Sequence, residues 1–298
     1  MNRLPRIGVT VGDPAGIGPE IARKALEDPG LAALCRIHLY GPSAEADVAR
    51  FPVGQLSPEA GRAAYEAIVA AVGDARAGVI DAIATAPVNK AAFAAAGLAW
   101  MGHTDLLAHL TGARRVAMMF HAEALRVVLA TVHVPLADVS RMLTTELLEG
   151  VIELADSELP RFGVKAPRLA LAGLNPHAGE GGLIGREEVD VLSPAVAACR
   201  RRGIQVDGPF PGDTIFVRAV RGEFDAVVAC YHDQGLIPIK MAAFGRAVNV
   251  TLGLPIVRTS VDHGTAFDIA GKGIADPSSL VEAIKLAARL CTAQSGTL

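Results

Sequence analysis

Short apolar runs alternate with longer Ala-rich stretches along most of the chain. Several of these runs are hydrophobic at nearly every position, which is typical of strands covered on both faces by helices. The pattern therefore predicts a mostly parallel or mixed sheet between helical layers. The candidate strands are residues 6–11, 37–40, 79–85, 115–120, 126–133, 168–172, 226–231 and 247–252.

Helix start signals lie between the candidate strands. Pro19 and Glu20 suit a first helical turn, because proline lacks an N–H that would go unpaired there and an acidic side chain interacts favourably with the helix dipole. Further helices are predicted from Ser57 to about residue 72, from Thr144 or Thr145, from Gly185 to Gly203, and from Ser278 or Ser279 to about Cys291. This alternation of strands and helices places the chain in the α/β class.

The length of 298 residues is that of two ordinary domains or one large one. No internal repeat, low-complexity segment or Gly/Ser linker divides the chain, so two domains would be joined by strands or helices that cross between them. The hydrophobic content of 51% excludes intrinsic disorder. The four cysteines have no metal-ribbon spacing, which indicates free thiols.

Charge and composition exclude several partners. The net charge is −3, and the only basic run, Arg200 to Arg202, ends a predicted helix, so the chain offers no electrostatic surface for nucleic acid. The aromatic content of 4% also argues against modules that stack on bases. There is no signal-peptide pattern, and no apolar run reaches the roughly 18 residues that span a bilayer. We therefore expect a cytoplasmic protein without nucleic-acid or membrane partners.

Two polar, Gly-rich segments follow predicted strands, where ligands of open α/β sheets collect. Residues 12–20 read GDPAGIGPE, whose spacing departs from the dinucleotide motif G-x-G-x-x-G. This segment is compatible with a tight strand-to-helix turn or with an active-site loop of another kind. His103 and Thr104 follow a glycine at a predicted helix start, where backbone N–H groups can bind an anion and a threonine can also serve as an ordinary cap.

Three of the eight histidines share one context, a strand end followed by Pro, Gly or an acidic residue. They are His133, His177 and His232, which lie 44 and 55 residues apart and can meet only through the fold. Three neutral imidazoles form an open catalytic metal site, so the pattern is compatible with a divalent metal and equally with structural histidines.

The last part of the chain carries two cationic side chains and one amide in apolar surroundings. Lys240, Asn249 and Arg258 lie within or beside apolar segments, which suggests an anionic ligand or ordinary ion pairs. Residues 260–277 then concentrate Gly, His and Asp before a helix, as a ligand loop or a capped structural loop would.

Together these segments resemble the 4-hydroxythreonine-4-phosphate dehydrogenase family of vitamin B6 biosynthesis. The matching stretches occur in family order and cover nearly the whole chain. They are GDPAGIGPE, TAPVNK, GHT, TVHVPL, LNPHAGEGG, GPFPGDT, YHDQGLIPIK, VNVTLGLP and RTSVDHGTA.

The resemblance implies an α/β fold like that of isocitrate and isopropylmalate dehydrogenases: two α/β/α domains with a cleft between them. It places a discontinuous cofactor-side domain at about residues 1–128 and 256–298, and a metal- and dimer-interface domain at about residues 129–255. It also implies a homodimer in which both subunits contribute to each active site.

The family's functional residues carry over to positions that this chain retains. The resemblance places a divalent metal (Zn, Mg or Co) on His133, His177 and His232. It places the substrate on His103, Thr104, Lys240, Asn249 and Arg258, and catalytic acidic residues at Asp213 and Asp233. It places NAD or NADP in the last loop, with His263, Gly264 and Asp268 as the expected contacts.

The implied reaction is oxidation of the C3 hydroxyl of 4-phosphohydroxy-L-threonine by NAD(P), followed by decarboxylation to 3-amino-2-oxopropyl phosphate. Related dehydrogenases act on 4-phospho-D-threonate or 4-phospho-D-erythronate, and these substrates stay open as alternatives. An alternative of another class is a non-catalytic ligand-binding protein.

The chain departs from the family between about Ser43 and Ser57, where this stretch is shorter than in many members. Since none of the matched site motifs includes it, we expect it to lie away from the site and to affect only peripheral structure.

Overall fold

The computed structural model describes residues 3–243 and 245–295, and its contacts divide the chain into two compact units. Unit 1 is built from residues 1–114 and 248–298, and unit 2 from residues 115–247. The predicted domain boundaries at 128/129 and 255/256 lie 14 and 8 residues after the observed boundaries at 114/115 and 247/248. The difference arises because two antiparallel strand pairs, residues 117–129 and 248–260, each stay together in one unit.

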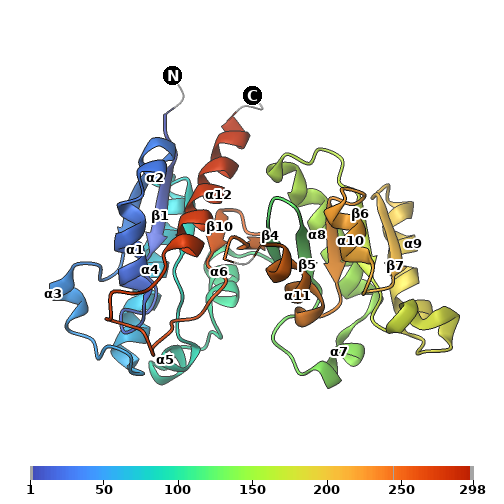
Figure 1. Ribbon diagram of the computed structural model, residues 1–298, viewed down its shortest axis with the longest axis horizontal. Coiled ribbons are helices and arrows are strands. Elements are labelled where there is room, and N and C mark those ends of the chain that lie inside the picture. Colours follow the sequence, from blue (N-terminus) through green and yellow to red (C-terminus); the bar gives the residue numbers. More distant parts are fainter. Residues whose placement is uncertain (1–2, 244, 296–298) are drawn as a thin grey trace. The chain divides into compact units, whose positions relative to one another are not determined.

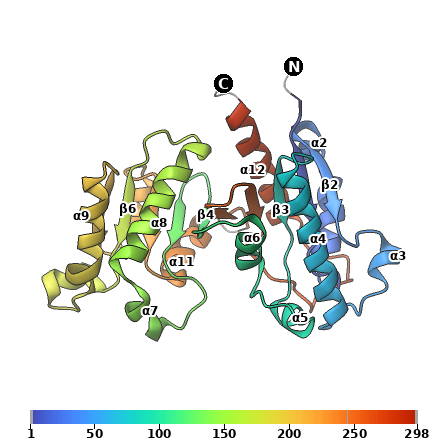
Figure 2. The same ribbon diagram turned by 180° about the vertical axis from the view of Figure 1, so that it is seen from behind.

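Unit 1 contains five strands in the order β2-β1-β3-β10-β9, all parallel except β9, which runs antiparallel to β10. The strands are β1 (Arg6–Thr10), β2 (Arg36–Tyr40), β3 (Ala82–Thr85), β9 (Val248–Leu252) and β10 (Val257–Ser260). The helices are α1 (Gly18–Leu26), α2 (Pro29–Leu34), α3 (Glu45–Val48), α4 (Pro58–Arg76), α5 (Lys90–Ala95), α6 (His103–Thr111) and α12 (Ser278–Ser295). Helices α1 and α12 cover one face of this sheet, and α4 and α6 the other (Figures 1 and 2).

Unit 2 contains five strands in the order β4-β5-β8-β6-β7, parallel except for the β4–β5 hairpin. The strands are β4 (Ala117–His121), β5 (Arg126–Leu129), β6 (Leu169–Ala172), β7 (Val206–Phe210) and β8 (Ala226–Ala229). The helices are α7 (Leu136–Met142), α8 (Thr145–Glu158), α9 (Ser193–Arg201), α10 (Ile215–Val220) and α11 (His232–Ala243), with short turns η1 (Leu159–Phe162), η2 (Pro176–Gly182) and η3 (Glu188–Leu192). Helices α8 and α9 lie on one face, and α10 and α11 on the other (Figures 1 and 2).

The predicted alternation of strands and helices is confirmed, with local differences. Strand β7 was not predicted, because Gly208 and Pro209 interrupt its apolar pattern. Strand β10 was not predicted either, since Arg258 is a charged residue in a four-residue run that is buried throughout. Two predicted strands, 126–133 and 226–231, end at Leu129 and Ala229, and α11 begins at His232. Among the described residues, no helix is long and apolar enough to cross a membrane.

The segment after β1 is a tight strand-to-helix turn. Gly12 has a φ of +73°, and a Cβ there would lie 2.2 Å from the Pro87 carbonyl oxygen, so only glycine fits. Asp13 is fully buried, and its Oδ1 accepts a hydrogen bond of 2.9 Å from the Ala15 N–H. Its Oδ2 has no hydrogen-bond partner in the part of the chain that the structure describes. Burial raises the pKa of the Asp13 carboxyl above its usual value, because the charged form is poorly solvated there.

This burial predicts a pH-dependent effect of Asp13→Asn. The folded state favours the protonated Asp13, so the wild type loses stability as the pH rises from the unfolded pKa, near 4, through the raised folded value. The asparagine amide keeps an acceptor for the Ala15 N–H and cannot ionise. The free energy of unfolding of the variant, measured in urea, should therefore rise relative to that of the wild type between pH 4 and pH 8. Asp13→Ala, which loses the acceptor, should be less stable than Asp13→Asn throughout. A constant difference in the free energy of unfolding between the wild type and Asp13→Asn from pH 4 to pH 8 would contradict this account.

Candidate active site

Two of the three candidate metal-binding histidines lie side by side in unit 2. His133 follows β5 and His232 begins α11 directly after β8, and β5 and β8 are paired in parallel. The pairing continues past the strands, since the Thr131 N–H donates to the Cys230 carbonyl oxygen. The carboxyl ends of parallel neighbours meet at one edge of a sheet, so both imidazoles are brought together there, with ring centroids 5.4 Å apart.

An acidic neighbour orients His232. Its Nδ1 lies 2.7 Å from Asp233 Oδ1, which fits a hydrogen bond donated by the ring to the carboxylate. A histidine held at Nδ1 in this way presents Nε2 to a ligand, and metal-binding histidines usually have such a carboxylate partner. The chemistry of the donor set therefore fits a divalent cation.

His177 does not join this pair within one chain. Its side chain is 71% exposed and contacts Glu180, with 3.2 Å between His177 Nδ1 and Glu180 Oε2. Across residues 3–243 and 245–295, no three His, Cys, Asp or Glu side chains lie close enough together to hold a metal ion. The three histidines come after β5, β6 and β8, which are neighbours in the sheet, but the structure brings only two of them together.

The loop that carries His177 is a left-handed turn. Residues 177–181 all have positive φ, and three of the five, His177, Ala178 and Glu180, are not glycine. Each non-glycine residue in this conformation costs roughly 1–2 kcal/mol. A turn with this much strain must be held by its surroundings.

Two acidic side chains, Glu188 and Glu187, hold this turn, and they were not among the predicted site residues. Glu188 is 3% exposed, and its carboxylate accepts hydrogen bonds from the Asn175 N–H at 2.7 Å and from Asn175 Nδ2 at 2.9 Å. Glu187 accepts a further bond of 2.7 Å from Asn175 Nδ2. Both glutamates belong to the GREE segment, which the sequence identifies only as a helix start.

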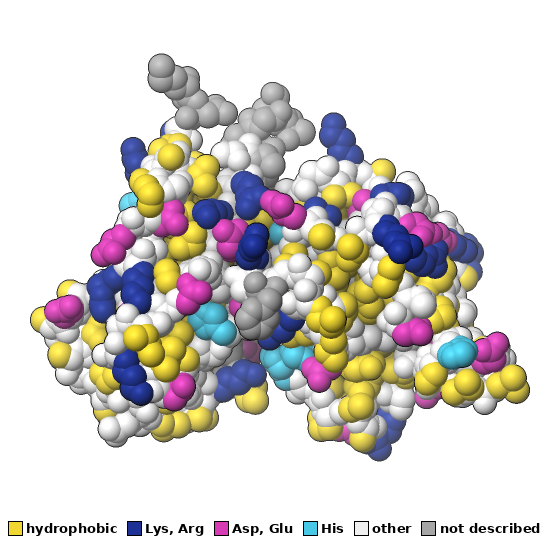
Figure 3. Space-filling model, in the orientation of Figure 1, with side chains coloured by type: hydrophobic (Ala, Val, Ile, Leu, Met, Phe, Trp, Pro, Cys, Tyr) yellow, Lys and Arg dark blue, Asp and Glu magenta, His cyan; other side chains and the backbone are white. Residues whose placement is uncertain are grey.

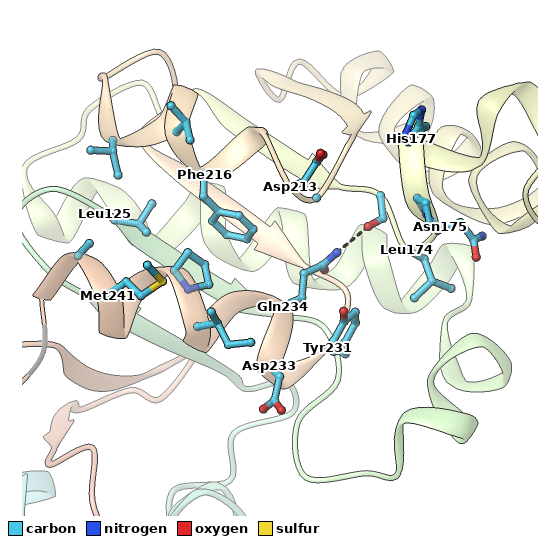
Figure 4. Close-up of a pocket in the computed structure, with 18 of the residues that line it drawn as sticks. Leu125, Leu174, Asn175, His177, Asp213, Phe216, Tyr231, Asp233, Gln234 and Met241 are labelled. Atoms are coloured by element: carbon cyan, nitrogen blue, oxygen red, sulfur yellow. Dashed lines mark hydrogen bonds between the residues drawn. The ribbon is translucent and has the colours of Figure 1, made fainter.

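A pocket of about 1030 Å³ opens beside these groups in unit 2, and Figure 4 shows its lining. The lining includes His177, Asp213 and Asp233, so the predicted acidic residues and one of the histidines share it. Gln234 spans part of its wall by donating a hydrogen bond of 2.6 Å to the Gly173 carbonyl oxygen. Lys240 lies two turns further along α11 and is half-buried.

Unit 1 contains a buried cation that has no acidic partner among the residues described. Arg258 on β10 is 2% exposed, and its Nη1 and Nη2 donate to Thr251 Oγ1 at 2.9 Å and Thr85 Oγ1 at 2.7 Å. Its Nε is buried and has no hydrogen-bond partner among the described residues. Burial lowers the pKa of the Arg258 guanidinium to about 9. A buried guanidinium whose hydrogen-bond partners are neutral is a strong site for an anion from outside the chain.

Other predicted substrate residues in unit 1 share this environment. His103 begins α6, and burial together with the charge of Arg258 lowers its pKa well below the usual value, so its imidazole is neutral. Among the described residues, His103 Nε2 and Asn249 Oδ1 are buried without hydrogen-bond partners. Thr104 follows on the first turn of α6 and is half-buried.

The predicted cofactor loop lies in unit 1 between β10 and α12. His263 Nδ1 lies 3.0 Å from the Gly264 carbonyl oxygen, and Gly264 and Asp268 are exposed. Lys24 on α1 fastens the end of this loop by donating to the carbonyl oxygens of Gly273 at 3.0 Å and Ala275 at 2.7 Å.

The expectation that the shortened stretch between Ser43 and Ser57 lies away from the site motifs is wrong. A Cβ on Gly54 would lie 2.8 Å from the Phe267 carbonyl oxygen, and one on Gly271 would lie 2.8 Å from Val53 Cγ1. The stretch therefore packs against the candidate cofactor loop, which follows it by more than 200 residues in the sequence.

Comparison with known proteins gives matches along nearly the whole chain. The family model of the pyridoxal phosphate biosynthetic protein PdxA matches residues 23–287. The chain is 45% identical to the 4-hydroxythreonine-4-phosphate dehydrogenase of Desulforapulum autotrophicum, with 97% of this chain and 96% of the relative covered. It is 46% identical to the D-threonate 4-phosphate dehydrogenase of Cupriavidus necator, with 97% and 98% covered.

Solved structures share the fold. A 4-hydroxythreonine-4-phosphate dehydrogenase from Klebsiella pneumoniae has a TM-score of 0.87 at 40% identity, covering 97% of this chain and 98% of that chain. A terephthalate 1,2-cis-dihydrodiol dehydrogenase from Burkholderia xenovorans has a TM-score of 0.67 at 33% identity, covering 96% and 98%. An isocitrate dehydrogenase from Methylococcus capsulatus has a TM-score of 0.51 at 18% identity, covering 96% and 88%, so the predicted fold class is confirmed.

The environment of Arg258 predicts opposite effects of Arg258→Met on stability and on anion binding. Methionine fills a similar space without a buried charge, so the free energy of unfolding in phosphate-free buffer should rise by roughly 1 kcal/mol or more. Phosphate should raise the melting temperature of the wild type but not of the variant. Arg126→Met is the matched control, because Arg126 is half-buried with a buried Nε but has Asp225 nearby, and it should keep the phosphate response. A loss of stability in Arg258→Met without phosphate would show that Arg258 is structural.

Proposed function

Since the chain belongs to the family of the pyridoxal phosphate biosynthetic protein PdxA, we propose that it oxidises 4-phosphohydroxy-L-threonine at the C3 hydroxyl. The oxidant is NAD or NADP, which takes two electrons, and the resulting β-keto acid loses CO₂ to give 3-amino-2-oxopropyl phosphate. The observation that carries the proposal is the buried environment of Arg258, which has no acidic partner among the described residues and suits an anionic ligand. The substrate supplies both a phosphate and a carboxylate.

In this proposal the substrate's anionic groups bind to the predicted cationic and polar side chains. Arg258 contributes charge and directed N–H donors, and Lys240 contributes a second cation. Thr104 and Asn249 add neutral polar groups. The neutral imidazole of His103 can donate or accept one hydrogen bond and adds no charge beside Arg258.

His133 and His232 hold a divalent cation in the proposal, with His177 as the third ligand. When bound, such a cation supplies Lewis acidity, which lowers the pKa of an alcohol and stabilises negative charge on its oxygen. Imidazole ligands suit several divalent ions, so Zn, Mg and Co are all compatible with this donor set.

Asp213 or Asp233 accepts the proton of the C3 hydroxyl, directly or through water. Asp213 is exposed at the pocket and free to meet a substrate, whereas Asp233 orients His232 through its Oδ1. This difference favours Asp213 as the proton acceptor and Asp233 as the residue that positions the imidazole. His263, Gly264 and Asp268 bind the nicotinamide cofactor in the loop before α12.

We propose further that the protein is a homodimer in which His177 completes the metal site of the second copy. The proposal is supported by the separation of His177 from the other two histidines within one chain. Apolar side chains on α10 and α11 offer a surface for a partner: Val217, Val220, Ile237 and Met241 are 47–83% exposed and line the pocket beside His177. Figure 3 shows hydrophobic side chains gathered over these two helices. We place the dimer in the cytoplasm, which suits four cysteines that form no disulfide within the described part of the chain.

A second substrate has direct support, because the chain is as similar to a D-threonate 4-phosphate dehydrogenase as to the 4-hydroxythreonine-4-phosphate dehydrogenases. The metal-binding and anion-binding groups described above suit either substrate, as well as 4-phospho-D-erythronate. A ligand-binding protein without catalysis is the alternative of another class.

The proposed function predicts metal-dependent reduction of NAD or NADP. The purified protein should form NADH or NADPH, read at 340 nm, with 4-phosphohydroxy-L-threonine in preference to 4-phospho-D-threonate and 4-phospho-D-erythronate. Chelation should abolish the activity and one of Zn, Mg or Co should restore it. Preference for another of the three acids would change the substrate within this function. Binding of all three without reduction of the cofactor would identify a binding protein.

The shared metal site predicts complementation between two inactive variants. His177→Ala and His232→Ala should each be inactive alone. A mixed dimer would contain one site with both substitutions and one intact site, so an equimolar mixture refolded or co-expressed together should recover about a quarter of wild-type activity. If His177 acted within its own chain, every site of the mixture would contain a substitution and no activity would return.

A further inference from the structure

The hydroxyl groups around Arg258 come from three neighbouring strands of unit 1, β3, β9 and β10. Ser260 on β10 lies opposite Thr85 on β3, and Thr251 lies on β9, which pairs with the other side of β10. Successive side chains of a strand point to opposite faces, so Arg258 and Ser260 share one face of β10 and Thr259 points to the other. Thr85, Thr251, Ser260 and Arg258 are all buried.

Hydrogen bonds connect Arg258 through these hydroxyl groups to the backbone. Arg258 Nη2 can only donate, so Thr85 Oγ1 accepts that bond of 2.7 Å and directs its own proton elsewhere. Ser260 Oγ, at 2.9 Å from Thr85 Oγ1, is the nearer acceptor for this proton, and the Thr259 carbonyl oxygen lies at 3.5 Å. Ser260 Oγ in turn lies 3.3 Å from the Thr85 carbonyl oxygen, to which it can donate.

We propose that Thr85 is a positioning residue for anion binding, which holds the Arg258 guanidinium in place through its hydroxyl without neutralising it. This inference rests on the proposed function for the identity of the anion, a phosphate or carboxylate of the substrate. Nothing in the sequence marks Thr85 as part of the site except its place in TAPVNK, at the end of a predicted strand.

Hydroxyl partners leave the charge of Arg258 available to a ligand, whereas a carboxylate partner would not. A carboxylate against Arg258 would hold the side chain more strongly but would also cancel its charge, and an incoming anion would have to displace or outcompete it. Hydroxyl groups of Thr85 and Thr251 fix two nitrogens of the guanidinium and leave its charge for the ligand. The remaining N–H groups, including the unpartnered Nε, face no competing acceptor among the described residues.

Thr259 offers a matched control on the same strand. It is as buried as Thr85, and its Oγ1 donates a hydrogen bond of 2.8 Å to the Ala283 carbonyl oxygen on α12, on the opposite face of the sheet. Replacing Thr259 by valine removes one buried hydroxyl, as Thr85→Val does, but it breaks only the bond to Ala283 and leaves Arg258 untouched.

The test compares Thr85→Val, Thr85→Ser and Thr259→Val by calorimetric titration with inorganic phosphate and by steady-state kinetics. Loss of a hydrogen bond to a charged group corresponds to roughly a 10- to 100-fold weaker affinity. Thr85→Val should weaken phosphate binding and raise KM for the phosphorylated substrate in this range, with a smaller change in kcat. Thr85→Ser should recover most of the affinity. Thr259→Val should lower the melting temperature but keep the dissociation constant and KM within about twofold, since it acts only on stability.

Equal effects of Thr85→Val and Thr259→Val would overturn the proposal, as would a Thr85→Ser protein as weak as Thr85→Val. If Thr85→Val does not fold, Thr85→Ala serves in its place, because it also removes the hydroxyl that contacts Arg258 and should weaken phosphate binding in the same range. An unchanged affinity in that variant would equally overturn the proposal, as would a wild type that binds neither phosphate nor substrate. If the wild type binds phosphate and Thr85→Val weakens it, but no cofactor is reduced, the proposed function fails and the role of Thr85 stands.

Discussion

The parallel pairing of neighbouring strands decides where the polar groups of each unit lie. In unit 2, β5, β8 and β6 are adjacent and parallel, so the segments that leave their carboxyl ends emerge at one edge of the sheet. These segments carry His133, His232 and His177. In unit 1, the parallel pairing of β3 with β10 places Thr85 opposite Ser260, beside Arg258. The backbone pairing thus assembles groups that are far apart along the chain, before any side-chain contact is considered.

Each unit contains one feature that lowers its folding stability, Arg258 in unit 1 and the turn of residues 177–181 in unit 2. Arg258 is taken out of water without an opposite charge, and the left-handed turn of residues 177–181 contains three non-glycine residues at a total cost of roughly 3–6 kcal/mol. The surrounding structure offsets part of this cost through neutral hydroxyl groups around Arg258 and through the hydrogen bonds between Glu188 and Asn175. A well-packed apolar side chain or a relaxed turn would be more stable in either place, which is typical of groups kept for binding and catalysis.

Sequence patterns located the residues of the candidate site better than the elements that carry them. His232 was expected at the end of a strand and instead begins α11, because the strand ends at Ala229 and the acidic Asp233 suits a first helical turn. Strand β10 was not predicted, because its buried arginine departs from the apolar pattern by which buried strands are identified. The same contradiction is the physical sign of an anion site, since a charge is buried only where something compensates for it.

The α/β class, the motifs of the family and the residue types available for chemistry follow from the sequence, because periodicity and local spacing depend only on neighbouring residues. Which of these residues meet depends on the tertiary structure. In the fold His133 and His232 lie side by side, whereas His177 lies apart from them on a strained turn. Arg258 is hydrogen-bonded to hydroxyl groups instead of carboxylates. The fold also brings the stretch around Gly54 against the loop at Phe267. Such contacts depend on strand order and register, which arise from the packing of the whole unit and have no signature in any short segment of the chain.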